Sequence, residues 1–142
     1  MENKIYLDTN IFIDLMDSTR PFSKESFMLL KHFIAEGKTF YINSDTVTNA
    51  FYILSKTKRY TNSELLLVIK KTVSIFTVVA VENDEVLRAL DLCEDVTTSF
   101  KDYEDALQYI CAVKIDAKYI ITNDKGFVSL DIKIKKTNEF VF

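Results

Sequence analysis

Glycine and histidine are scarce in this sequence of 142 residues, which holds two glycines and one histidine. Gly37 and Gly126 lie far apart, so the chain cannot form a glycine-rich loop that cradles phosphates or a dinucleotide. A Ser-His-Asp or Cys-His catalytic system would have to use His32, and no nucleophile motif accompanies it. We therefore exclude most nucleotide-cofactor enzymes and interpret His32 as a residue on a helix face.

Cysteine and long apolar runs are also scarce. Cys93 and Cys111 are too widely spaced for a Cys-x-x-Cys pair and lack histidine partners, which argues against a zinc site and predicts reduced, buried side chains. The chain has no apolar run of ~18 residues and no basic-then-apolar signal at its start. We expect a cytoplasmic protein with no membrane partner.

The composition is that of a globular protein, with 48% hydrophobic and 27% charged residues. The length suits one domain and no linker or repeat divides it, so we expect a single domain over residues 1–142. The net charge of −3 is not typical of a nucleic-acid binder. The charge is uneven, however, because residues 82–105 are rich in acids and a basic stretch lies elsewhere, at Lys56, Lys58 and Arg59.

Short apolar runs alternate with segments of helical spacing along the whole chain. Strands are predicted at residues 4–7, 40–42, 76–81, 119–122 and 132–134. Helical apolar stripes are predicted at residues 11–16, 23–36, 47–54, 65–73, 87–92 and 102–113. The predicted N-caps include Ser23, Ser44 or Asp45, Thr61 or Asn62, and Asn83 or Asp84. This alternation predicts an α/β fold with a central parallel sheet of four to five strands flanked by helices.

Acidic residues stand where predicted strands end, which is where an open parallel sheet binds its ligands. Asp8 follows the first strand, and Asp124 follows the fourth by way of Asn123. Asp102 and Asp105 lie three residues apart at the start of a helix, so their carboxylates share one face and can meet the strand-end acids. The sequence therefore predicts that these carboxylates converge.

Converging carboxylates raise each other's pKa unless a cation neutralises them. Hard oxygen ligands select Mg²⁺ or Mn²⁺, and such a site activates water for attack on phosphorus without a histidine. A structural interpretation stays open for Asp102 and Asp105, because an N-cap acid followed by an acid at the third helical position needs no metal. The set of acids at three crevice positions favours a metal site.

Three segments together resemble the PIN domain family. They are residues 5–10 (IYLDTN), 102–108 (DYEDALQ) and 119–124 (YIITND), the last followed by Phe127. The resemblance spans nearly the whole chain and implies a PIN-like three-layer sandwich with metal-dependent ribonuclease activity. Because short single-domain bacterial members are VapC-type toxins of toxin-antitoxin pairs, it also implies an RNA substrate such as tRNA or mRNA, an antitoxin partner and a homodimer.

The resemblance assigns roles to matching positions. It implies that Asp8, Asp105 and Asp124 hold the metal and are catalytic, with Asp102 as an additional metal-binding acid. It further implies that Thr122 and Asn10 support these ligands.

Asn49 departs from the family pattern, which usually places a glutamate on the helix after the second strand. An amide can offer an oxygen to Mg²⁺ but supplies no negative charge. We therefore expect a lower metal affinity, unless Asp45 or Asp102 compensates.

The leading hypothesis is a Mg²⁺- or Mn²⁺-dependent endoribonuclease, the toxin of a type II toxin-antitoxin pair. Its alternative is a catalytically weak PIN-like module that binds RNA or a partner, because of Asn49. A phosphatase or receiver-like domain is disfavoured, since Asn10 stands where a haloacid-dehalogenase-type phosphatase needs a second Asp. Lys56, Lys58 and Arg59 are candidates for RNA backbone contacts, with a solvated helix end as the alternative.

Overall fold

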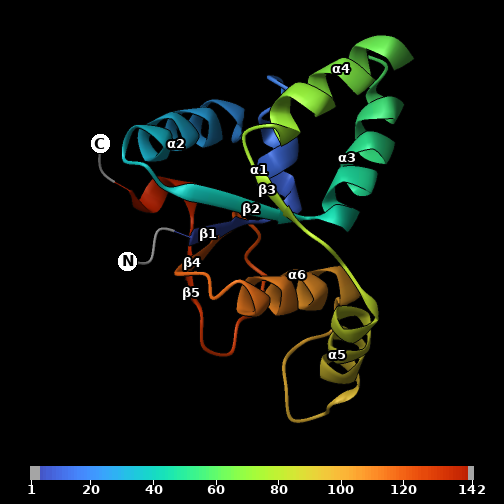
Figure 1. Ribbon diagram of the computed structural model, residues 1–142, viewed down its shortest axis with the longest axis vertical. Coiled ribbons are helices and arrows are strands. Elements are labelled where there is room, and N and C mark those ends of the chain that lie inside the picture. The colour runs from blue at the N-terminus through green and yellow to red at the C-terminus, as the bar shows by residue number, and fades with distance from the viewer. Residues whose placement is uncertain (1–3, 141–142) are drawn as a thin grey trace.

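A parallel sheet of five strands forms the centre of the protein in the computed structural model, which describes residues 4–140 (Figure 1). The strands are β1 (Lys4–Leu7), β2 (Thr39–Asn43), β3 (Thr77–Val79), β4 (Tyr119–Ile121) and β5 (Lys133–Lys135). Their order in the sheet is β3-β2-β1-β4-β5, and all four neighbouring pairs are parallel. The predicted α/β fold with a parallel sheet is confirmed, with β3 shorter than expected.

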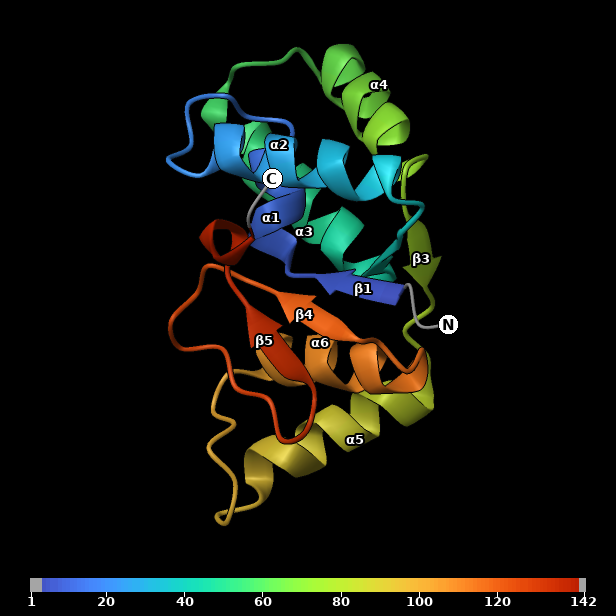
Figure 2. The same ribbon diagram turned by 90° about the vertical axis from the view of Figure 1, so that its left-hand side faces the viewer.

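Helices cover both faces of this sheet. They are α1 (Thr9–Asp14), α2 (Ser23–Ala35), α3 (Ser44–Thr57), α4 (Asn62–Val73), α5 (Asn83–Glu94) and α6 (Tyr103–Lys114), followed by the 3₁₀ turn η1 (Thr137–Glu139). Helices α1 to α4 lie on one side of the sheet, and α5 and α6 lie on the other (Figures 1 and 2). The result is the three-layer arrangement that the family resemblance implied. None of the helices within residues 4–140 is long and apolar enough to cross a membrane.

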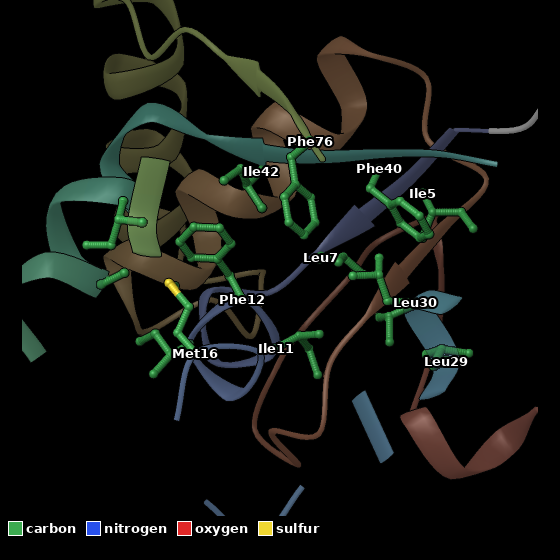
Figure 3. Close-up of a cluster of buried hydrophobic side chains, with 14 of the residues drawn as sticks. Ile5, Leu7, Ile11, Phe12, Met16, Leu29, Leu30, Phe40, Ile42 and Phe76 are labelled. Carbon is green, nitrogen blue, oxygen red and sulfur yellow. The ribbon is translucent and has the colours of Figure 1, made fainter. Parts of the chain in front are cut away.

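Two hydrophobic clusters, one on each face, hold the layers together. Alternate residues of β1 serve both, because successive side chains of a strand point to opposite faces. Ile5 and Leu7 join the cluster under α1 to α4, whereas Tyr6 joins the cluster under α6. Figure 3 shows the first cluster, in which the rings of Phe12 and Phe76 meet edge to face with centroids 5.4 Å apart. A central strand buried on both sides explains the continuous apolar run in the sequence.

Some predicted helix caps are wrong. Phe22, not Ser23, is the N-cap of α2, and the Ser23 hydroxyl donates instead to the Asp14 carbonyl at 2.7 Å. Asn43 caps α3 in place of Ser44 or Asp45, with its Oδ1 accepting from the Thr46 N–H at 2.9 Å. Asn43 is the last residue of β2 and already has the extended backbone that an N-cap needs.

Of the two remaining predicted caps, one is confirmed and one is wrong. Thr61 is confirmed as the N-cap of α4, where it exchanges hydrogen bonds with Glu64. Glu82 rather than Asn83 or Asp84 precedes α5, because its backbone is extended and its N–H bonds to the Glu85 carboxylate at 2.8 Å.

Gly37, His32 and the two cysteines occupy structural positions and not the acidic group of the predicted site. Gly37 ends α2 with a φ of +76°, a left-handed conformation that favours glycine. His32 lies on the exposed side of α2, with its Nε2 3.3 Å from the Glu36 carboxylate. Both cysteines are free thiols. Cys111 is buried as predicted, but Cys93 is only half-buried because it lies near the end of α5.

Candidate metal centre

Asp8 occupies the carboxyl end of the central strand β1, directly before α1, and is only 3% exposed. Its Oδ2 accepts a hydrogen bond from Thr122 Oγ1 at 2.7 Å, and its Oδ1 accepts one from Gln108 Nε2 at 2.9 Å. Burial raises the pKa of Asp8 and the nearby Asp124 carboxylate raises it further, whereas these hydrogen bonds oppose the shift. Asp8 is therefore a buried carboxylate that two side-chain hydrogen bonds hold in place.

The end of β4 brings a second acid beside the first. Strands β1 and β4 are parallel neighbours, with Leu7 paired to Ile121, so the residues that follow them meet at the same edge (Figure 2). The backbone N–H of Asp124 donates to Thr122 Oγ1 at 3.0 Å. The Asp124 carboxylate is exposed and accepts from the Gly126 N–H at 2.8 Å.

Helix α6 contributes further acids at its first turn. Asp102 is the N-cap, and its Oδ1 accepts from the Asp105 N–H at 3.1 Å, so the capping interpretation of this pair is confirmed. Asp105 is half-buried, and burial raises its pKa to about 7, with additional repulsion from Asp102, Asp8, Asp124 and Glu104. The acids that follow β1 and β4 and those at the start of α6 therefore lie close enough to raise the pKa of Asp105.

Glu104 belongs to this group of acids, although the sequence analysis did not single it out. It is half-buried, and its Oε2 accepts from Asn49 Nδ2 at 2.6 Å and from Thr9 Oγ1 at 3.5 Å. Burial raises the pKa of Glu104, and Asp8 and Asp102 raise it further. Its position in the same helical turn as Asp102 and Asp105 was the signal that could have identified it.

Gln108 is the second residue that the sequence analysis missed. It is 1% exposed and lies one turn after Glu104 on α6. Its Oε1 accepts from the Thr9 N–H at 2.9 Å, while its Nε2 holds Asp8. Thr9 in turn shares a hydroxyl hydrogen bond of 2.9 Å with Thr46 on α3. A continuous polar network therefore links α1, α3 and α6 around Asp8.

Of the two residues predicted to support the metal ligands, Thr122 contacts the strand-end acids through its side chain and Asn10 does not. Thr122 contacts both strand-end acids, as described above. The exposed Asn10 side chain instead accepts from Arg20 Nη2 at 3.2 Å, and only its backbone N–H bonds to Asp8. Arg20 lies on the wall of an open pocket of about 340 Å³ that adjoins Asp124 and is lined also by Phe22 and Asn123.

The predicted basic residues lie at the far end of α3, where the helix gives way to a turn. Lys56 Nζ sits 4.0 Å from the centre of the Tyr52 ring, and Arg59 Nε lies 3.4 Å from Asp17 Oδ1. Lys58 is exposed and ends the helix in a left-handed conformation. None of the three forms an ion pair with the acids around Asp8 within residues 4–140.

The donor chemistry of this acidic group fits a hard divalent cation. Its candidate ligand atoms are carboxylate oxygens, and across the described residues no Lys or Arg pairs with Asp8, Glu104, Asp105 or Asp124. In the same part of the chain, no three acidic, histidine or cysteine side chains are already close enough to hold a metal ion.

Comparison with known proteins gives consistent matches at the level of sequence. The PIN domain family model matches residues 4–126. Ribonuclease VapC1 of Aquifex aeolicus (strain VF5) is 35% identical over 137 residues, which cover 96% of this chain and 92% of that protein.

Solved structures match the fold. VapBC2 from Rickettsia felis, bound to a DNA fragment from its promoter, matches with a TM-score of 0.70 and 16% identity, over 94% of this chain and 98% of that one. Mycobacterium tuberculosis VapC20, a toxin that cleaves the sarcin-ricin loop, matches with a TM-score of 0.68 and 14% identity, over 89% of this chain and 98% of that one. At these identities the structural likeness concerns the fold.

Proposed function

This chain belongs to the PIN domain family, and we propose that it is a divalent-metal-dependent endoribonuclease, the toxin of a type II toxin-antitoxin pair. The observation that carries the proposal is the acidic group around Asp105, in which Asp8 and Asp124 follow the neighbouring parallel strands β1 and β4 and Asp102 and Asp105 begin α6. The 35% identity to a protein named Ribonuclease VapC1, over nearly all of both chains, supports RNA as the substrate.

In this proposal Asp8, Asp105 and Asp124 hold Mg²⁺ or Mn²⁺ and are the catalytic residues, with Asp102 as an additional acid. A divalent cation held by these residues would activate a water and would offset the negative charge that develops on the phosphodiester. Thr122 donates to the Asp8 carboxylate and accepts from the backbone N–H of Asp124, so it joins the two proposed ligand residues.

The residues that orient the ligands have separate tasks. Gln108 holds the second oxygen of Asp8 and, through Thr9, ties α6 to the start of α1. The Asp105 N–H is occupied by Asp102, which fixes the first turn of α6 and with it the direction of the Asp105 side chain. Preorganised ligands of this kind lower the cost of assembling the site when cation and RNA bind.

Substrate contacts are proposed at two places. Lys56, Lys58 and Arg59 supply positive charge for the RNA backbone, although Arg59 also pairs with Asp17. The open pocket beside Asp124 gives room for a nucleotide next to the acids. Whether the RNA is tRNA or mRNA depends on contacts outside the acidic group.

Solved structures with the same fold include a toxin-antitoxin complex from Klebsiella pneumoniae, which supports an antitoxin partner for this chain. We also propose that the chain forms a homodimer and acts in the cytoplasm. Large apolar side chains are exposed on three helices of one layer and suit protein interfaces. They include Phe27 and Met28 on α2, Tyr52 on α3, and Leu66 and Leu67 on α4.

The test is RNA cleavage by the purified protein with Mn²⁺, Mg²⁺ or EDTA, on structured and unstructured RNA. We expect cleavage that requires the metal and is lost in Asp105→Asn. Asp91→Asn is the matched control, because it removes an exposed carboxylate of α5 by the same chemical change. Absence of cleavage with every metal, together with intact RNA or antitoxin binding, would favour the weak binding module that Asn49 suggested.

A further inference from the structure

Asn49 and Glu104 join α3 to α6 through a hydrogen bond of 2.6 Å from Nδ2 to Oε2. They are 55 residues apart in sequence, and both are half-buried. An ionised carboxylate only accepts hydrogen bonds, so the NH₂ group of the amide must face Glu104. The amide oxygen of Asn49 is then directed away from that glutamate. Asn49 acts here as a donor to a carboxylate rather than as an oxygen ligand.

The neighbours of Glu104 place it beside Asp8. Gln108 follows Glu104 by four residues on α6, so both side chains lie on the same face of the helix. Gln108 donates directly to Asp8, and Thr9 Oγ1 contacts both Gln108 Oε1 at 3.3 Å and Glu104 Oε2 at 3.5 Å. Glu104 therefore faces the carboxyl end of β1, where the proposed metal ligands gather.

Only one oxygen of Glu104 is used for these contacts. Oε2 accepts from both Asn49 and Thr9, whereas Oε1 has no hydrogen bond or ion pair within the described part of the chain. The side chain is held in place by groups from α1 and α3, and one of its oxygens remains available. This is how a carboxylate is arranged when one oxygen orients it and the other binds a cation.

We infer that Glu104 is a ligand of the divalent cation proposed at Asp8, Asp105 and Asp124, and that Asn49 is the positioning residue that holds it there. The inference rests on the proposed function. It explains why an amide stands at position 49: a glutamate in its place would face Glu104 at hydrogen-bond distance, and the two like charges would repel each other. The negative charge absent at position 49 is supplied by Glu104 on α6.

The test measures Mn²⁺ binding to the metal-free protein by calorimetric titration, without RNA. Glu104→Gln keeps the size of the side chain and an acceptor for Asn49 but removes the charge. We expect it to weaken Mn²⁺ binding about ten-fold or more. The exchange variant Asn49→Glu/Glu104→Gln returns one carboxylate to the same pair of positions and should recover most of the affinity.

Two further variants separate ligand, positioning and background effects. Asn49→Ala removes the donor and should weaken Mn²⁺ binding less than Glu104→Gln does, because the carboxylate is still present. Glu64→Gln on α4 removes one exposed glutamate charge away from the acidic group, and its Mn²⁺ binding should equal that of the unmodified protein. Thermal melts of each metal-free variant report whether the fold is kept.

Failure of the inference differs from failure of the proposed function. If Glu104→Gln binds Mn²⁺ as tightly as the unmodified protein while Asp105→Asn loses binding, Glu104 is not a ligand and the proposed function stands. If Glu104→Gln loses affinity, melts at a lower temperature and is not rescued by the exchange, its role is structural and the inference is overturned. If the unmodified protein binds no Mn²⁺, both the proposed function and the inference fall.

Discussion

The Thr122 hydroxyl donates a hydrogen bond of 2.7 Å to Asp8 Oδ2 across two neighbouring strand ends. The hydroxyl oxygen of Thr122 also accepts a hydrogen bond from the backbone N–H of Asp124 at 3.0 Å. Thr122 and Asp8 are both almost completely buried, at 1% and 3% exposure. A single hydroxyl therefore fixes the spacing of two proposed metal ligands, and it does so where water cannot replace it.

Replacing Thr122 by valine tests this relationship, because valine keeps the shape of the side chain and removes only the hydroxyl. Asp8 then loses a buried donor and Asp124 N–H loses its acceptor, so the free energy of unfolding should fall by about 1–3 kcal/mol. Urea denaturation of the metal-free protein measures the change. Thr122→Ser, which retains a hydroxyl, should lose less. A valine variant as stable as the unmodified protein would contradict the role assigned to the hydroxyl.

The pH dependence of stability should report the repulsion around Asp105. Burial and the surrounding carboxylates raise the pKa of Asp105 from 3.8 to about 7, so the folded protein keeps a proton that the unfolded chain has already released. Stability of the metal-free protein should therefore fall as the pH rises from about 4 to about 7, and this contribution should then level off. The raised pKa values of Asp8 and Glu104 act in the same direction.

Thermal melts at several pH values, for the unmodified protein and for Asp105→Asn, measure this effect. The variant should show a weaker fall of Tm with pH, since its amide does not titrate. Mn²⁺ affinity of the unmodified protein should rise with pH up to about 7, because the cation competes with the proton at Asp105. A Tm that rises between pH 5 and pH 8 in the metal-free protein would count against the repulsion.

The positions of Asp8 and Asp124 could be predicted from the sequence because they depend on local patterns. Each acid follows a short apolar run, and parallel strands bring such ends to one edge. The partners of Asp8 depend instead on how α6 is rotated against the sheet. Gln108 and Asp8 are 100 residues apart, and no local spacing indicates which side chains of α6 face β1.

The pairing of Asn49 with Glu104 could not be predicted for the same reason. Residue 49 was recognised as a departure, but its consequence depends on the distance between α3 and α6 in the folded chain. Helix caps show the limit on a smaller scale. The predicted strand ended at residue 42 and Ser44 or Asp45 was the predicted cap, whereas the backbone geometry shows that β2 extends to Asn43 and leads directly into α3.

The buried ion pair between Asp14 and Arg20 leads to a prediction about the stability of the fold, independent of the proposed activity. Asp14 is 3% exposed, and its carboxylate accepts from Arg20 Nε at 2.6 Å and from Ser26 Oγ at 3.2 Å. Removing the guanidinium leaves this buried charge with one donor, so Arg20→Ala should lower the free energy of unfolding by about 1.5–3 kcal/mol. Urea denaturation measures the loss.

An exposed ion pair provides the control for that measurement. Arg88 Nη1 lies 3.7 Å from Asp84 Oδ2 on the surface of α5, so Arg88→Ala should cost less than about 1 kcal/mol. If Arg20→Ala and Arg88→Ala lower the free energy of unfolding by equal amounts, the burial of Asp14 does not strengthen its ion pair with Arg20.

Charge reversal at the end of α3 tests whether the basic stretch contacts RNA. Lys56→Glu/Lys58→Glu leaves the Arg59 pair with Asp17 intact, so the effect of the change is confined to the two lysines. The matched control is Lys70→Glu/Lys71→Glu, which makes the same charge change on exposed residues in the last turn of α4. Both double variants place acids near a helix C-terminus, so any loss from the helix dipole is common to the two.

If the α3 lysines bind phosphates, their reversal should weaken RNA binding and lower the slope of log K against log salt by roughly 1 to 2, because fewer counterions are released. Binding is measured by fluorescence anisotropy with Asp105→Asn in every protein, so that the RNA stays uncut. Equal weakening in the α3 and α4 variants would indicate a general effect of net charge. A change confined to the α3 pair would place the RNA backbone along the end of this helix, because a general charge effect would appear in both variants.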